Sequence, residues 1–105
     1  MMTPDIEVKL TMLPTEHGGR KTPVASGYRP QFYYRNDDCD AEHNYLDTKE
    51  VRPGDTVIAQ LSFYRPDFHV PRVHEGMPFL IREGNKTVGY GRILRILATD
   101  RLVAP

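Results

Sequence analysis

Short segments in which apolar and polar residues alternate, separated by glycine- and proline-rich stretches, restrict this fold more than any other feature of the sequence. In residues 6–12 every second residue is apolar, and residues 57–63 repeat the pattern, which is the period of a strand with one buried face. Further strands are expected at 31–35, 43–47, 77–82 and 87–97. No segment has a convincing helical pattern. About six short strands predict an all-β barrel or sandwich, and a barrel leaves no unpaired edge strand.

The segments between the strands are expected to be turns and loops. Arg52–Asp55 (R-P-G-D) and Glu83–Lys86 (E-G-N-K) have the residues of tight turns. We expect a long ordered loop at 14–27, an acidic loop or frayed edge at 36–42, a loop at 65–76 and a loose tail at 98–105. The strand pattern predicts a core of Ile6, Val8, Leu10, Phe32, Val57, Ala59, Leu61, Phe79, Ile81, Val88 and Ile96.

Net charge limits the kinds of partner that fit this chain, and cysteine content limits the cellular compartment. Lys plus Arg and Asp plus Glu number 14 each, so the neutral chain is a poor general binder of nucleic acid, and no DNA partner is expected. The single cysteine, Cys39, cannot form an internal disulfide, which fits a reducing, cytoplasmic compartment. No apolar run approaches the roughly 20 residues that span a bilayer. The first 13 residues alternate and lack a signal peptide's apolar region.

Three motifs carry a resemblance to a known family. The first is G-G-R-K-T-P at 18–23 with G-Y-R-P-Q-F-Y-Y-R at 27–35, the second is R-P-G-D at 52–55, and the third is F-L-I-R-E-G-N-K-T-V-G-Y-G at 79–91. In order and spacing they resemble the C-terminal (third) domain of elongation factor Tu. The resemblance implies a six-stranded antiparallel closed β-barrel at residues 5–97, with an N-terminal extension at 1–4 and a tail at 98–105.

The resemblance also implies two sets of contacts. The family's barrel touches the T-stem backbone of aminoacyl-tRNA, packs on a GTPase domain and helps bind a nucleotide-exchange factor. The positions that match its RNA contacts are Gln31, Arg65, Arg82, Glu83 and Gly84. Those that match its protein interfaces are Gly19, Arg20, Tyr28, Arg29, Gln31 and Leu80.

Two features depart from the family pattern. Asp40 stands where the family often has a small hydroxyl residue near the RNA, and an aspartate repels phosphate. The segment 65–75 is a few residues longer than in the family, and inserted loops are common sites of new binding surface.

No nucleotide or catalytic site is expected. The 105 residues contain no G-x-x-x-x-G-K-[ST] loop, and Gly84–Thr87 lacks its glycine spacing and following helix. No G-x-S-x-G motif or other combination of nucleophile, base and orienting group occurs. We therefore expect a non-enzyme without a cofactor, and no GTP hydrolysis by this chain alone.

Three groups of side chains invite a metal or nucleophile hypothesis. The acidic segment 37–43 lacks the glycine and distal Glu of an EF-hand. His69 and His74 lack the further ligands of a tetrahedral site, and Cys39 has no nearby His–Asp pair. The default interpretations are a solvated acidic loop, loop histidines and an incidental thiol, with no metal bound.

Two functions remain open. In the first, the chain is a stand-alone relative of the third domain that binds translation components, with aminoacyl-tRNA or a GTPase domain in trans as its partner. In the second, it is a protein-interaction or mimicry module that no longer meets tRNA. A truncated gene product that has kept its fold is a further alternative.

Overall fold

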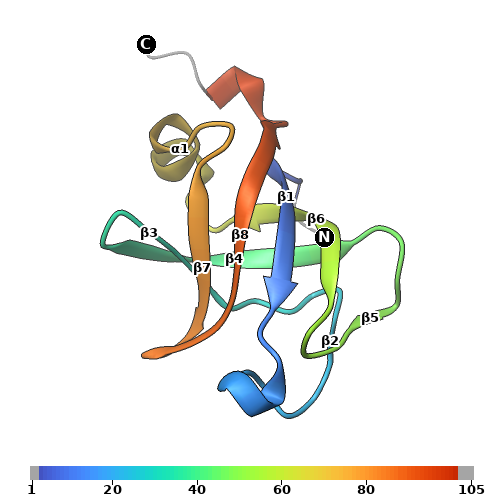
Figure 1. Ribbon diagram of the computed structural model, residues 1–105. Helices are drawn as coiled ribbons and strands as arrows, with labels where there is room; N and C mark the ends of the chain where they lie inside the picture. Colours follow the sequence, from blue (N-terminus) through green and yellow to red (C-terminus); the bar gives the residue numbers. More distant parts are fainter. Residues whose placement is uncertain (1–2, 102–105) are drawn as a thin grey trace.

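A closed barrel of six antiparallel strands forms the body of the computed structural model, which describes residues 3–101 (Figure 1). The strands of the barrel are, in chain order, β1 (Ile6–Met12), β3 (Gln31–Tyr34), β4 (Asp37–Tyr45), β6 (Thr56–Phe63), β7 (Pro78–Glu83) and β8 (Lys86–Ile96). They are hydrogen-bonded in the order β1-β6-β4-β3-β7-β8 and back to β1. The predicted all-β class and the six-stranded antiparallel closed barrel are confirmed.

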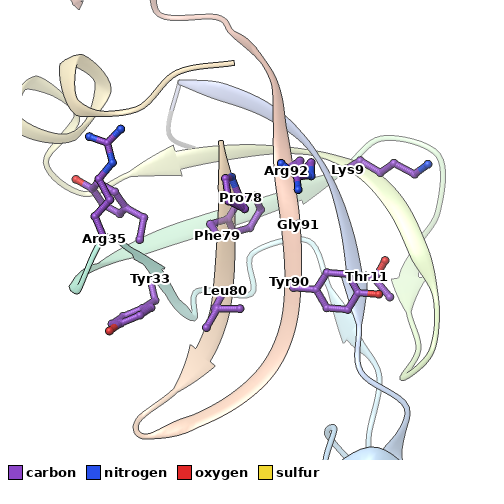
Figure 2. A pocket seen from close by; sticks show the side chains of 11 residues that line it. Lys9, Thr11, Tyr33, Arg35, Pro78, Phe79, Leu80, Tyr90, Gly91 and Arg92 are labelled. Atoms are coloured by element: carbon purple, nitrogen blue, oxygen red, sulfur yellow. The ribbon is translucent and has the colours of Figure 1, made fainter. Parts of the chain in front are cut away.

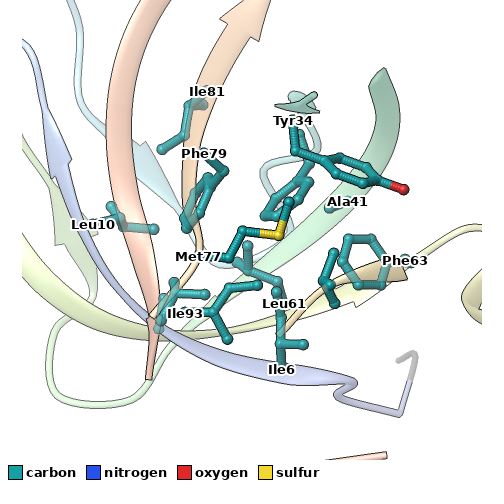
Figure 3. Packing of buried hydrophobic residues seen from close by; sticks show 14 of the residues in the cluster. Ile6, Leu10, Tyr34, Ala41, Leu61, Phe63, Met77, Phe79, Ile81 and Ile93 are labelled. Atoms are coloured by element: carbon teal, nitrogen blue, oxygen red, sulfur yellow. The ribbon is translucent and has the colours of Figure 1, made fainter. Parts of the chain in front are cut away.

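Apolar and polar residues alternate in the strands because one face of each strand lines the inside of the barrel. In β1 the side chains of Ile6, Val8, Leu10 and Met12 are buried, whereas Lys9 is exposed. The centre of the barrel is aromatic: the ring centroids of Phe32 and Phe79 lie 4.4 Å apart and stack, and Phe63 meets Phe32 edge to face. Figure 3 shows the rings of Phe63 and Phe79 converging with aliphatic side chains from the other strands. Most predicted core residues are buried, but Val57 and Ile96 are only partly buried at the margin.

The predicted acidic loop at 36–42 is wrong. Asp37–Tyr45 is the strand β4, and Arg35 and Asn36 form the turn that joins it to β3, with φ values of 48° and 63°. Positive φ at both central residues is the geometry of a type I′ hairpin, in which Asn is favoured. The low strand propensity of aspartate is overridden because β4 pairs with β3 on one side and β6 on the other.

Short elements occur in segments that were expected to be loops. The 65–76 segment contains α1 (Pro66–His69) and η2 (Val70–Arg72), so the expectation of no helix is wrong there. The 14–27 segment contains η1 (Thr15–His17) and β2 (Val24–Ala25), which pairs with β5 (Glu50–Val51). The predicted tail begins with a buried Ala98 and η3 (Thr99–Arg101), and residues 102–105, like residues 1–2 of the predicted extension, lie outside the described range.

The barrel presents several outer surfaces on which a partner can act. In Figure 1, β7, β8 and β1 lie in front, β3 and β4 cross behind them, and α1 and the blue turn of η1 lie at opposite ends. No helix within residues 3–101 is long and apolar enough to cross a membrane. Because side chains fill the inside of the barrel, a binding site has to be sought on the outer faces of the strands or in the loops at the two ends.

Candidate functional site: an outer strip across four strands

Gln31 is the centre of a row of side chains that runs around the outside of the barrel. On β3 it lies directly opposite Arg82 of β7 on one side and Asp40 of β4 on the other. Arg65 follows the end of β6 and lines a hollow with Asp40, and the Tyr64 backbone N–H donates to the Asp40 carbonyl at 3.2 Å. The structure thus brings three predicted RNA-binding residues into one row with Asp40, and we call Arg82, Gln31, Asp40 and Arg65 the outer strip.

Arg82 is held in place without being neutralised. Its guanidinium lies 4.6 Å from the centre of the Tyr33 ring, and one terminal nitrogen donates to the Asn85 carbonyl at 3.3 Å. Its Nε and the Oε1 of Gln31 are both buried without a hydrogen-bond partner. Because buried polar atoms are normally partnered, the contact between β3 and β7 at Gln31 and Arg82 is incompletely satisfied by the residues that the structure describes.

The Glu83 side chain does not face the outer strip. It joins the β7–β8 hairpin to the long loop before β3. Its carboxylate accepts hydrogen bonds from Arg20 and, at 2.5 Å, from the Tyr28 hydroxyl. Burial by itself would raise the pKa of Glu83, but these two hydrogen bonds and the charge of Arg20 outweigh it and lower the pKa. One predicted RNA-binding residue is therefore joined to two predicted partner residues in a contact that no sequence motif indicated.

Gly84 forms the exposed tip of this hairpin. It has a φ of +61° and begins the two-residue turn Gly84–Asn85 between Glu83 and Lys86, a position for which glycine is suited. No heavy atom outside its chain neighbours lies within 4 Å of where its Cβ would be. The tip is therefore open to the close approach of another backbone.

The remaining predicted partner residues do not form one patch. Gly19 is buried: a Cβ there would lie 2.0 Å from the Leu13 carbonyl oxygen. Arg29 donates to the Tyr64 hydroxyl and lies 3.5 Å from a carboxylate oxygen of Glu42. Leu80 lies elsewhere, on the outer face of β7 opposite Tyr33. Sequence matching alone did not indicate this separation.

The segment 65–75 packs against the barrel. His69 is buried, and its Nδ1 lies 2.7 Å from the Tyr34 hydroxyl oxygen. Phe68 is exposed and lies between two cations, 5.4 Å from the Arg65 guanidinium and 4.7 Å from that of Arg72. Arg72 in turn contacts Asp37 at 3.5 Å, so part of the acidic charge of β4 is compensated by the segment 65–75.

The histidines of the segment 65–75 and Cys39 make structural contacts. Within residues 3–101, no group of three or more His, Cys, Asp and Glu side chains is arranged to hold a metal ion. His69 is buried, whereas His74 is exposed beside the Glu75 carbonyl. Burial, reinforced by Asp37, Asp38 and Asp40, raises the pKa of the Cys39 thiol to about 12, which keeps it protonated and weakly nucleophilic at neutral pH.

Comparison with known proteins identifies the lineage of this barrel. Residues 2–97 match the family described as the elongation factor Tu C-terminal domain. A curated relative, elongation factor Tu 2 of Streptomyces avermitilis, is 44% identical over 88 residues. The match covers 84% of this chain and 22% of that relative, so the chain corresponds to about a fifth of the longer protein.

Proposed function

Since the chain belongs to the family of elongation factor Tu C-terminal domains, we propose that it is a non-catalytic binding module whose partner in translation is aminoacyl-tRNA. The proposal rests chiefly on one observation. Gln31 and Arg82, two positions that match the family's RNA contacts, lie opposite each other on the outer strip, and both residues are partly exposed. An RNA backbone supplies both acceptors, on phosphate, and donors, on the ribose hydroxyl.

The roles proposed for the other residues follow from their contacts. The Arg82 guanidinium would pair with a phosphate, and the Gln31 amide would bond a 2′-hydroxyl, the group that distinguishes RNA from DNA. Gly84 would allow the sugar–phosphate chain to approach the hairpin tip. Glu83 would act indirectly, by holding the hairpin through Arg20 and Tyr28. Arg65, exposed at the far end of the strip, would add a second phosphate contact.

The affinity of the module alone should be modest and sensitive to salt. The strip has two cations, with Asp40 between them along the row. Each phosphate contact contributes about one unit to the slope of log affinity against log salt concentration. A few contacts therefore give weak binding that is strongest at low ionic strength.

The test is a titration of fluorescently labelled aminoacyl-tRNA with the intact chain at several salt concentrations. We expect Arg82→Ala to weaken binding and to reduce the salt slope by about one unit. Arg95→Ala is the matched control, because Arg95 lies on β8 and is already paired with Glu7 at 3.3 Å. Equal affinity and equal slope for the wild type and Arg82→Ala would refute the assignment of Arg82 to RNA.

A second candidate function is a protein-interaction module that no longer binds tRNA. Asp40 favours it, because its carboxylate stands directly opposite Gln31 in the middle of the outer strip. A purified GTPase domain of an elongation factor Tu, added in trans, is the probe. Binding of that domain by a chain that binds no aminoacyl-tRNA even at low salt would select this candidate over the first.

A further inference from the structure

A groove on the outside of the barrel lies beside the outer strip but contains none of its residues. It crosses β3, β7, β8 and β1 and has a volume of about 580 Å³. Figure 2 shows its side chains in two rows. One row is Tyr33, Leu80, Tyr90 and Thr11, and the other is Arg35, Pro78, Arg92 and Lys9. We call this surface the basic groove.

The second row is cationic and uncompensated. Arg35, Arg92 and Lys9 line the groove, and no Asp or Glu of the described residues does. Within residues 3–101, none of the three forms an ion pair, and Arg92 makes only a hydrogen bond to the Gly76 carbonyl at 2.8 Å. Glu7, the outward carboxylate that precedes Lys9 on β1, is held by Arg95. In a chain of zero net charge, this is a local concentration of positive charge.

The first row is apolar and accessible. Leu80 is 38% exposed and Tyr90 is 49% exposed, and they lie opposite each other on β7 and β8. Below them the floor is fixed by the core: a Cβ at Gly91 would lie 2.7 Å from the Phe79 ring and 2.5 Å from the Lys9 carbonyl oxygen. Because β8 and Phe79 are already in contact there, the backbone beneath the groove is held in place by the core.

We infer that the basic groove binds an amphipathic helix with an acidic flank, supplied by a partner protein. Neighbouring strands are about 4.8 Å apart, and a helix advances about 5.4 Å per turn. Apolar residues at i, i+3 or i+4, and i+7 of a helix crossing the strands would therefore meet Tyr33, Leu80 and Tyr90 in turn.

The second row then selects the charge of that helix. The two rows are two residues apart along each strand, about 7 Å, and a helix with its side chains is about 10 Å wide. A helix seated on the apolar row would hold one flank over Arg35, Arg92 and Lys9. Glu or Asp on that flank would be attracted and Lys or Arg repelled, which sets orientation and specificity.

We favour a protein over an RNA as the ligand because the apolar and the cationic side chains of the groove lie in separate rows. The apolar area lies in one continuous row containing a leucine, and the cations follow one edge of it. Aromatic residues and arginine around an apolar centre are typical of protein interfaces. The inference does not depend on the proposed tRNA contact, since Gln31, Arg65 and Arg82 are absent from the groove. It gives a chemistry to the partner surface around Leu80.

The experiment is a selection of random 16-residue peptides displayed on phage against the immobilised intact chain. We expect enriched peptides to have apolar residues at helical spacing and an excess of Glu and Asp on one adjoining flank. The affinity of an enriched synthetic peptide should fall about tenfold or more in a Lys9→Glu, Arg92→Glu double variant, because attraction is replaced by like-charge repulsion. Both side chains are exposed, so the variant should fold, which thermal unfolding checks.

Lys21→Glu, Lys49→Glu is the control matched in charge, because both lysines are exposed outside the groove, and it should leave peptide affinity unchanged. Amide chemical shifts should move on peptide addition at Leu80, Tyr90 and Arg92. Three outcomes would overturn the inference: no enrichment, enriched peptides without an acidic flank, or full affinity in the double variant. Labelled tRNA that loses its binding in the double variant but not in Arg82→Ala would assign the groove to RNA, and would refute both this inference and the assignment of Arg82 to RNA.

Discussion

The outer strip and the basic groove share strands β3 and β7, yet their charges are arranged in opposite ways. On the strip, Arg82 and Arg65 stand at the ends of a row that includes Asp40, and Asp37 nearby is paired with Arg72. In the groove, three cations follow one edge and no carboxylate lines the surface. The strip is a mixed polar surface, and the groove is a cationic surface with an apolar row.

Along the shared strands, the two surfaces are only two residues apart. On β7 the outward residues are Arg82, Leu80 and Pro78 in succession, and on β3 Gln31 is followed by Tyr33. Outward positions recur every second residue, so a strand can present one chemistry at one end and another a few ångströms away. A small barrel can thereby offer two binding surfaces from the same strands, and variants should affect them together or separately.

The largest expected effect removes the support that both surfaces share. Phe79 is buried under β7 and stacks on Phe32 under β3. We expect Phe79→Ala to lower the free energy of unfolding by roughly 3–5 kcal/mol, and to weaken tRNA and peptide binding through loss of folded protein. Urea denaturation measures the change, with the milder Phe79→Leu as its control. A Phe79→Ala protein as stable as the wild type would contradict the placement of this ring.

A second variant should affect the groove more than the strip, although it also touches the shared Phe79 ring. In Gly91→Ala the new methyl group would collide with the Lys9 carbonyl and the Phe79 ring, which should cost roughly 1–3 kcal/mol of stability. Peptide affinity should fall while tRNA affinity of the folded fraction stays the same. Tyr90→Ala removes an exposed groove side chain without any collision and should leave stability nearly unchanged. Equal stability of the two variants would contradict the close packing beneath β8.

Acid should lower the stability of the protein through His43, a buried residue of β4. Burial lowers the pKa of His43 to about 3, whereas an exposed histidine titrates near 6.5. Below pH 6.5 the unfolded chain therefore binds a proton that the folded chain excludes, so stability is complete above that pH and declines toward pH 3. Between pH 6 and 5, above the range of most carboxylates, His43 should contribute a slope of about 1.4 kcal/mol per pH unit.

Urea midpoints measured across this interval for the wild type and His43→Gln test the slope. Burial also lowers the pKa of His69, so the His43 contribution is the difference between the two proteins rather than the wild-type slope itself. Parallel stability curves would show that His43 is accessible to protons in the folded state.

The smallest expected effect adjusts the strip and leaves the groove unchanged. Asp40→Asn removes the carboxylate opposite Gln31, and we expect aminoacyl-tRNA affinity to rise roughly threefold at low salt, in keeping with the small energies of exposed charges. Asp47→Asn removes an exposed carboxylate away from the strip and should have no effect. A rise of equal size in both variants would indicate a general charge effect rather than a local one at Gln31.

The sequence predicted the strands in which apolar and polar residues alternate regularly. It failed to predict the strand that depends on pairing with its neighbours in the barrel. Ile6–Met12 and Thr56–Phe63 behave as their pattern indicates. The segment containing Asp37, Asp38 and Asp40 gave no strand signal, but its partners β3 and β6 make it one. The helix α1 is only four residues long, too short to show periodicity, and its burial of His69 against Tyr34 is a contact across 35 residues.

The sequence likewise predicted one part of the candidate site and missed another. Motif resemblance located Gln31, Arg82, Glu83 and Gly84, but it did not reveal that Glu83 is occupied by Arg20 and Tyr28. The basic groove had no sequence signal, because its members come from four strands and are separated by up to about 80 residues along the chain.

The sequence by itself determined the family, the β-class and the inward positions of most strands, because these depend on motifs and on a period that operates between near neighbours. The tertiary structure alone decided which outward side chains share a surface. Strand register sets that choice, and register depends on pairing between residues far apart in the chain. Thus Lys9 meets Arg92, and Gln31 meets both Arg82 and Asp40, in combinations that no local pattern encodes.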